Sequence, residues 1–319
     1  MPGAASGVPR ARREGLTSLA LSRHLSGRMR SSDTKPGRLA ERTARLKLML
    51  DFALRRGNSM RERARLFYYA EVKPSLAARR WARYRPGRIL SFSTRASPHG
   101  PFRVHIRDNG LDMCTFTEFF SSRYVLIPPE LPPLEPEVVY DIGANIGIAS
   151  LYYATRFPKA AFYGFEPVPS NVDVCRLNFR NLPRGEVFPW AVGGRSGTAF
   201  FEFSEEDLRG GRLEGQGQAK EDASKKRIEV PVFSIADLAV RKELPPPDFV
   251  KIDVEGAELE VLKGMAGQAG SIKRLLVETH GPEVDAACRQ WFGAHQFAIR
   301  HSHEAAPGFA AIWCDSVKG

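Results

Sequence analysis

The stretch Val138–Ile148 constrains the fold of this chain most, because it joins a short apolar run to a glycine turn and then to a helical pattern. The apolar run is typical of a buried parallel strand, and apolar residues recur at helical spacing from Ile146 onward. Gly143 can adopt a backbone conformation that other residues avoid, and Gly147 lets the helix approach its strand closely. In an α/β protein, this turn could present backbone N–H groups to a ligand at the carboxyl end of the strand.

The spacing of the glycines narrows the choice of ligand. A dinucleotide fingerprint has the pattern G-x-G-x-x-G, but Asn145 and Ile148 stand where its second and third glycines would be. The pattern that is present, D-x-G-x-x-x-G with Asp141 before the turn, resembles the first motif of class I S-adenosylmethionine (SAM) methyltransferases. A strand-to-helix turn that binds no ligand is the alternative interpretation.

A second strand is expected over residues 161–165, directly before the carboxylate of Glu166. An acidic side chain about 20 residues after such a glycine turn accepts hydrogen bonds from ribose hydroxyls in related α/β folds. Pro167 and Pro169 restrict the loop that follows, and Ser170 can cap the next helix. Glu166 is therefore the predicted ribose ligand, in preference to a solvated charge at the end of a strand.

Charge is distributed unevenly along the chain. Residues 1–90 contain 22 Lys and Arg against 6 Asp and Glu, whereas residues 91–319 contain 25 against 30. The basic front end could contact an anionic lipid surface, nucleic acid or an acidic partner, or it could be a solvated tail. No run approaches the roughly 20 apolar residues of a membrane span, and the four cysteines form no C-x-x-C pair. We expect a cytoplasmic protein, with peripheral contact at the inner membrane face as a further option.

Four segments are expected from the patterning. Residues 1–38 lack a sustained period and predict a disordered basic tail, and residues 39–87 predict a basic helical extension. Residues 88–136 predict short strands, a helix and a proline-rich linker. Residues 137–319 would then form the SAM-binding catalytic domain.

The segment D248-F-V-K-I-D-V-E-G-A-E-L-E-V-L-K-G264 predicts a buried strand followed by a helix. Asp253 lies at the carboxyl end of that strand and so faces the ligand crevice, which favours a functional role. Glu258 lies near the helix start, where a carboxylate interacts favourably with the helix dipole, and we assign it that structural role. A further strand ends on Glu278 and His280 at the same edge, which makes His280 a candidate catalytic residue.

Together, the segments V-V-Y-D-I-G-A-N-I-G, G-F-E-P, V-K-I-D-V-E-G-A-E-L-E-V-L-K-G and L-L-V-E-T-H resemble the FkbM family of methyltransferases. The resemblance implies a class I methyltransferase fold of the α/β class, with helices on both faces of a seven-stranded, mostly parallel sheet whose last hairpin is reversed. It also implies SAM-dependent O-methylation of a hydroxyl on a sugar, glycolipid or secondary metabolite. The residues expected at the cofactor are Asp141, Gly143, Ala144, Asn145, Gly147, Glu166, Asn171 and Ala191. Ala236 departs from the family, which often has an acid there.

The expected reaction is an in-line displacement, in which the acceptor oxygen attacks the methyl carbon as the sulfonium leaves. An alcohol is a poor nucleophile, so a base should remove its proton, and His280 or Asp253 could do so. Asp253, Glu278 and His280 could instead hold a divalent cation. The same residue types also serve a base site without metal, so no metal is predicted.

Two other functions stay open at this point. The basic front end would suit a nucleic-acid methyltransferase, although D-V-E-G stands where base N-methyltransferases carry a motif of the N/D-P-P-Y/F type. The chain could also be a SAM-binding or glycan-binding module without turnover, with the Arg-rich segment as an interaction arm.

Overall fold

A computed structural model describes residues 35–80, 82–95, 101–121, 127–204, 212–213, 226–241 and 243–317. Residues 1–34 of the expected basic tail lie outside the described residues. The expectation of disorder is wrong for residues 35–38, which form the first turn of helix α2 (Lys35–Arg56). The helical pattern of the basic extension therefore begins earlier than its composition indicated.

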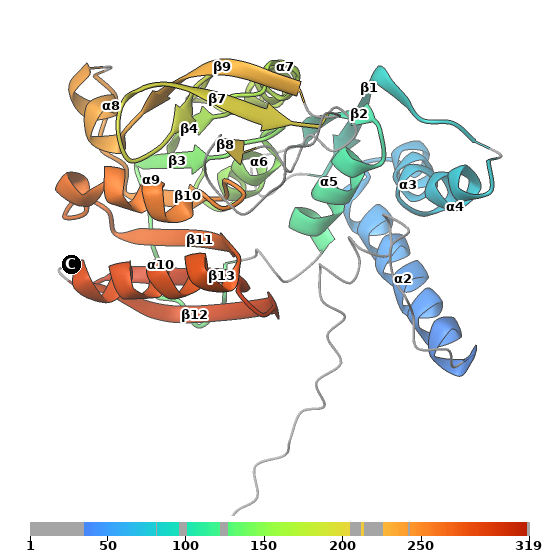
Figure 1. Cartoon of the computed structure of the whole chain (residues 1–319). Helices are drawn as coiled ribbons and strands as arrows, with labels where there is room; N and C mark the ends of the chain where they lie inside the picture. The colour runs from blue at the N-terminus through green and yellow to red at the C-terminus, as the bar shows by residue number, and fades with distance from the viewer. Residues whose placement is uncertain are drawn as a thin grey trace, which may run out of the picture.

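The centre of the molecule is a seven-stranded sheet with the order β12-β13-β11-β10-β3-β4-β5 (Figure 1). Its strands are β3 (Val138–Ile142), β4 (Ala161–Phe165), β5 (Gly185–Phe188), β10 (Phe249–Ile252), β11 (Arg274–His280), β12 (Phe297–Ala306) and β13 (Phe309–Ser316). Neighbouring strands are parallel except at β13, which is antiparallel to both β11 and β12. This arrangement confirms the expected seven-stranded sheet with a reversed hairpin at its end.

Side chains along each central strand alternate between two cores because successive residues point to opposite faces of a sheet. Val139 and Phe249 pack against one set of helices, whereas Tyr140 and Val250 pack against another. The first face is covered by α5 (Leu111–Ser121), α6 (Ile148–Ala154) and α7 (Pro169–Phe179). The second face is covered by α8 (Ile235–Arg241), α9 (Glu258–Gly264) and α10 (Pro282–Ala294), and the 3-10 helix η2 (Ala266–Gln268) contacts α8 and α9. The two layers confirm the α/β class.

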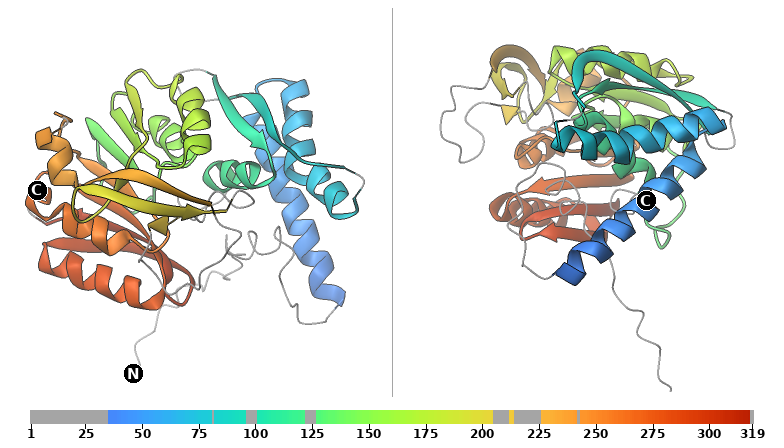
Figure 2. Two further views of the ribbon diagram at one scale, coloured as in Figure 1. Left: turned by 45° about the horizontal axis from the view of Figure 1, so that its top comes forward. Right: turned by 90° about the vertical axis from the view of Figure 1, so that its right-hand side faces the viewer.

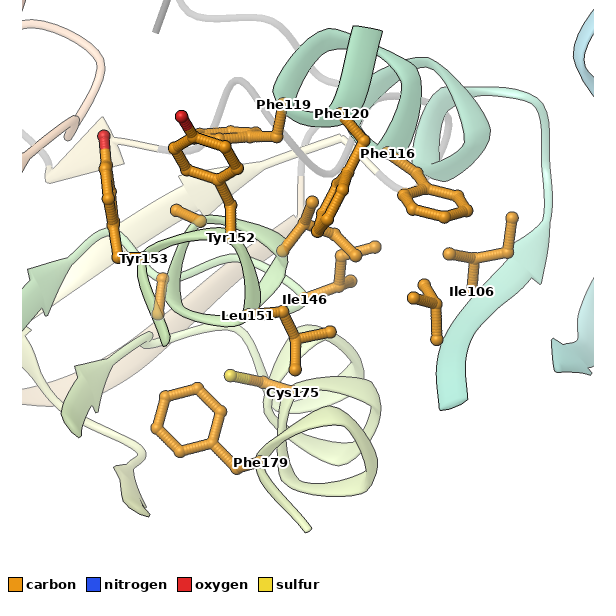
Figure 3. Packing of buried hydrophobic residues seen from close by; sticks show 14 of the residues in the cluster. Ile106, Phe116, Phe119, Phe120, Ile146, Leu151, Tyr152, Tyr153, Cys175 and Phe179 are labelled. Carbon is orange, nitrogen blue, oxygen red and sulfur yellow. The ribbon is translucent and has the colours of Figure 1, made fainter. Parts of the chain in front are cut away.

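The N-terminal elements pack on the first face and share its core. They are α2, α3 (Met60–Phe67), a π-helical turn η1 (Tyr68–Val72), α4 (Lys73–Ala78), and the antiparallel pair β1 (Arg85–Thr94) and β2 (Phe102–Asp108). Phe52 of α2 lies edge-on to Phe116 of α5, with 5.2 Å between ring centroids. Beside Phe116 on the same helix, Phe119 and Phe120 pack against Tyr152 of α6 (Figure 3). Helix α5 therefore connects the basic extension to the central sheet.

A second, smaller sheet follows β5 and has the order β6-β9-β7-β8. Its strands are β6 (Ala191–Val192), β7 (Gly197–Phe203), β8 (Arg212–Leu213) and β9 (Lys226–Phe233). In Figure 1 the long strands β7 and β9 lie near β4, at the end of the central sheet away from β12, and in Figure 2 α2 runs along one side of the molecule next to α5. Among the described residues, no helix is long and apolar enough to cross a membrane.

Asp248 fixes the register between β10 and β3 from just outside the sheet. Its carboxylate accepts hydrogen bonds from the backbone N–H groups of Glu137 and Val138, at 2.8 and 3.0 Å, and forms an ion pair with Lys273. Partial burial raises the pKa of Asp248, but these hydrogen bonds outweigh burial and hold the pKa below its usual value. The ionised carboxylate therefore stabilises the start of β3.

We expect Asp248→Asn to cost roughly 1–3 kcal/mol of unfolding free energy at neutral pH, because hydrogen bonds to a charged acceptor are lost. A depressed folded-state pKa contributes stability above the unfolded-state value, and that contribution disappears as pH falls through the folded-state value. The variant should therefore show a weaker loss of stability in acid than the wild type, measured by urea unfolding at several pH values. Asp173→Asn, at an exposed position on α7, is the control. Equal acid sensitivity of both variants and the wild type would contradict this role.

Candidate active site

The carboxyl ends of β3, β4, β10 and β11 meet at one edge of the sheet and carry most of the expected site residues. Asp141, in β3, is fully buried and accepts a hydrogen bond from Ser150 of α6 at 2.7 Å. Lys251 stands directly opposite it in the parallel pair of β10 and β3. Because in-register neighbours point to the same face, the two side chains meet beneath the first helical layer.

Lys251 is a buried ammonium group that joins three parts of this edge. Its Nζ lies 3.3 Å from a carboxylate oxygen of Asp141 and 3.3 Å from one of Asp253, and it donates to the carbonyl of Gly143 at 3.0 Å. Burial alone would lower the pKa of Lys251, but the carboxylates of Asp253 and Asp141 raise it above the usual value. The lysine is therefore charged and holds the turn after β3 against the end of β10.

The turn after β3 does not present its N–H groups as expected. Gly143 and Ala144 both donate to the carbonyl of Phe165 at 3.0 Å, and Gly147 donates to Ala144 at 2.7 Å. The N–H of Asn145 donates to Glu166 at 2.9 Å. The expectation that a ligand meets exposed backbone N–H groups is wrong for these four groups, because the adjoining strand β4 and the turn itself use them.

Asn145 has a left-handed backbone conformation, with φ of 50°, which is uncommon for a residue other than glycine. Its side-chain Oδ1 is buried and has no hydrogen-bond partner among the described residues. A buried acceptor without a partner is costly, and a strained residue at a turn is a common feature of ligand sites. Asn145 therefore has a buried acceptor at this turn that no described residue uses.

Glu166 is buried at the end of β4, and its carboxylate holds the loop around it. One oxygen accepts from the N–H of Val168 at 3.0 Å and from the Asn171 side chain at 3.1 Å, and the other accepts from Asn145. Burial raises the pKa of Glu166, and the three hydrogen bonds act in the opposite direction. A carboxylate has about four acceptor positions, so the oxygen bonded to Asn145 can accept one more donor.

Two of the expected cofactor residues lie in apolar surroundings. Ala144 is buried in the core of the first face. Ala191, in β6, packs with Val168 in the small core under the second sheet. Trp190 stacks on Phe188 with 4.5 Å between ring centroids, consistent with a core position for this ring. Among the polar residues expected at the cofactor, Asn145 and Asn171 are both hydrogen-bonded to the carboxylate of Glu166.

His280, at the end of β11, reaches the loop after β10. Its Nδ1 lies 2.9 Å from a carboxylate oxygen of Glu258, which is completely buried at the start of α9. Its Nε2 faces Asp253 and Glu255, at 3.8 and 3.7 Å from one oxygen of each. The structure therefore brings the two proposed catalytic residues, Asp253 and His280, together.

Burial would lower the pKa of His280, but the hydrogen bond to Glu258 and the charges of Glu255 and Asp253 raise it to about 10. Burial raises the pKa of Glu278, in the same strand, to about 8, with a further contribution from Asp253. The surroundings of these two side chains therefore favour the protonated forms of His280 and Glu278.

Comparison with known proteins identifies the family. Residues 141–303, just over half of the chain, match the model of the methyltransferase FkbM domain. The chain belongs to the FkbM methyltransferase domain family. The family uses S-adenosyl-L-methionine as its methyl donor.

Individual relatives cover parts of this FkbM domain. The chain is 33% identical to the hexuronic acid methyltransferase AglP of Haloferax volcanii over 146 residues, which are 46% of this chain and 57% of that protein. It is 28% identical over 218 residues to the 31-O-demethyl-FK506 methyltransferase FkbM of Streptomyces tacrolimicus, covering 60% and 82% of the two chains. It therefore spans little more than half the length of the haloarchaeal relative. A solved structure of a methyltransferase FkbM from Methylobacillus flagellatus aligns with a TM-score of 0.42 and 14% identity, covering 86% of this chain and 60% of that one.

The sequence analysis did not predict the roles of three residues in this candidate site. Lys251 was treated as part of a buried strand, although a lysine between apolar residues is a signal for a buried ion pair. Glu258 was expected only to interact with the helix dipole. This expectation was incomplete, because the buried carboxylate also forms a hydrogen bond with His280. Glu255, rather than Glu278, joins Asp253 and His280 as a potential metal ligand. Only the packing of β10, β11 and α9 could reveal the last two.

Proposed function

We propose that this chain is a SAM-dependent O-methyltransferase whose acceptor is a hydroxyl of a sugar, glycolipid or secondary metabolite. The observation that carries the proposal is the match of residues 141–303 to the FkbM family. The names of its relatives support a small acceptor, since one names hexuronic acid and another an O-demethylated FK506. A small molecule or a glycan is accordingly the partner that we expect at this site.

The residues of the turn after β3 fit SAM better than they fit a nucleotide. Phosphate groups need free N–H donors, and the N–H groups of Gly143, Ala144, Asn145 and Gly147 are already bonded. SAM carries no phosphate but has an ammonium group and ribose hydroxyls that donate hydrogen bonds. The Asn145 side chain would accept from one of these donors, and Glu166 would accept from the ribose.

Bound SAM supplies an electrophilic methyl group attached to a positively charged sulfur. In the transfer, the acceptor oxygen would bond to the methyl carbon as the carbon–sulfur bond breaks and its electron pair stays on sulfur. Asp253, at the end of β10, would face the acceptor hydroxyl and take up its proton, which then passes to solvent. Lys251 and Glu258 act as positioning residues, because the first contacts Asp253 and the second fixes the ring of His280.

Calorimetric titration of the full chain with SAM, and separately with NAD, tests the cofactor. We expect saturable binding of SAM and none of NAD. A folded sample that does not bind SAM would overturn the proposal. A positive result leads to a screen of sugars, glycolipids and hydroxylated metabolites for methyl transfer.

We expect Asp253→Asn to lower turnover by about 10²–10⁴-fold, in the range for removal of a proton-transfer group, while SAM affinity is unchanged. Glu260→Gln is the control, since Glu260 forms an exposed pair with Lys263 on α9. Turnover is measured with an acceptor from the screen, and affinity by calorimetry. Loss of SAM binding together with turnover would make Asp253 a cofactor residue, and full turnover would remove it from the reaction.

The two other candidate functions give different results in the same assays. A nucleic-acid methyltransferase would shift RNA or DNA in a gel with strong dependence on salt. A binding module without turnover would bind SAM or glycan and leave every acceptor unmethylated. Deletion experiments on the basic front end should stop at residue 34, because Met49, Phe52 and Ala53 of α2 belong to the main core.

A further inference from the structure

Three potential ligands for a metal ion gather beside the expected methyl-transfer position. They are Asp253 and Glu255, in the loop after β10, and His280, at the end of β11. One ligand atom from each lies within 4.8 Å of the others. The side chains are 20–35% exposed, so they are accessible to a solute from this edge.

The distances within this cluster leave room for an atom between the side chains. His280 Nε2 is 3.8 Å from Asp253 and 3.7 Å from Glu255, and both separations are too long for a hydrogen bond. Nε2 of His280 therefore faces the carboxylates of Asp253 and Glu255 without forming a hydrogen bond to either. Atoms that coordinate one cation typically lie about 3–4 Å apart when each bond is slightly above 2 Å.

The imidazole of His280 is held as metal-binding histidines usually are. Its Nδ1 is hydrogen-bonded to Glu258 at 2.9 Å, and the same oxygen of Glu258 accepts from the N–H of Gly256 at 2.9 Å. A carboxylate on one ring nitrogen fixes the tautomer and ring orientation, so that the other nitrogen is presented to the metal. Glu258 thus directs Nε2 toward Asp253 and Glu255, and a bound metal would displace the proton from Nε2.

The charges around the cluster favour a cation. Glu258 is fully buried, and its second oxygen has no hydrogen-bond partner among the described residues. Lys251 contacts Asp253, but it also compensates Asp141. Negative charge at low exposure is stabilised by a nearby cation.

We propose that Asp253, Glu255 and His280 bind a divalent cation of the Mn²⁺ type. Two carboxylates suit hard cations such as Mg²⁺ and Mn²⁺, and an imidazole nitrogen shifts the preference toward a transition metal. The catalytic use of the ion rests on the proposed function: the ion would bind the acceptor oxygen and lower the pKa of the hydroxyl, and its proton would pass to solvent. Binding of the ion does not depend on that function.

The experiment titrates the full chain with Mn²⁺ in the absence of SAM and follows free Mn²⁺ by electron paramagnetic resonance. We expect one saturable site, with affinity lowered at least tenfold in Glu255→Gln and in His280→Asn. Glu260→Gln should bind as the wild type does, and circular dichroism checks that each variant is folded. Absence of saturable binding at millimolar Mn²⁺, or equal binding by folded Glu255→Gln, His280→Asn and wild type, would overturn the proposal.

Two further outcomes separate this inference from the proposed function. Methyl transfer at an undiminished rate in EDTA, by a chain that binds SAM, would overturn the catalytic role of the ion and leave the methyltransferase intact. Saturable Mn²⁺ binding that requires Glu255 and His280, in a chain that does not bind SAM, would support the cation site and overturn the proposed function. If the carboxylates serve only to attract the positive sulfur of SAM, Mn²⁺ alone will not bind, and the proposal fails.

Discussion

Gly143→Ala should destabilise the protein by roughly 2–5 kcal/mol in urea unfolding and abolish SAM binding. Gly143 has φ of 75°, and a Cβ atom built there would lie 1.9 Å from the carbonyl oxygen of Asp253. A left-handed conformation costs about 1–2 kcal/mol for alanine, and overpacking against backbone adds about 1–3 kcal/mol. The turn could relieve the clash only by moving away from the end of β10. That movement would disturb the predicted cofactor residues of the turn and the predicted catalytic residue Asp253.

Two matched glycine substitutions separate these contributions. Gly256→Ala also has a positive φ, of 107°, but its Cβ would meet nothing within 4 Å. Gly267→Ala has neither a positive φ nor a close neighbour. We expect about 1–2 kcal/mol for the first and less than about 0.5 kcal/mol for the second. A cost for Gly143→Ala no larger than that of Gly256→Ala would show that the contact with Asp253 is unimportant.

Lys251→Met should lower the unfolding free energy by about 3–5 kcal/mol, because it leaves the buried carboxylate of Asp141 and the partly exposed one of Asp253 without their counter-charge. Methionine has a similar length and fits an apolar interior, so the loss would come from the charge and from the hydrogen bond to Gly143. Chemical denaturation at neutral pH measures the effect. Asp141→Asn in the same chain should recover part of the loss, since it removes one of the two stranded charges.

Lys263→Met is the matched control for this substitution. Lys263 also pairs with a carboxylate, Glu260, but its side chain is 53% exposed. Exposed ion pairs contribute about 0–1 kcal/mol, so little change is expected. Equal losses for Lys251→Met and Lys263→Met would contradict the role of the buried lysine. Additive losses for Lys251→Met and Asp141→Asn would contradict the coupling of these two residues.

Much of the fold could be predicted from the sequence because its signals are local. The apolar run before Asp141, the glycine turn and the helical spacing after it lie within a few residues of one another, and the same holds for the strand and helix around Asp253. Glu166 follows its strand at the expected distance from the turn. The resemblance to the FkbM family implied a seven-stranded, mostly parallel sheet with a reversed last hairpin, and the structure confirms it.

The tertiary structure decided how these local pieces meet, because the decisive contacts join residues far apart in the chain. Lys251 reaches Asp141 only through the parallel register of β10 and β3. Glu258 becomes a partner of His280 only because α9 packs beside β11, and Glu255 faces Nε2 only because the loop after β10 turns there. The sequence therefore determined the framework and its family, whereas the charge pairing of the site depends on strand register and helix packing, which no local pattern contains.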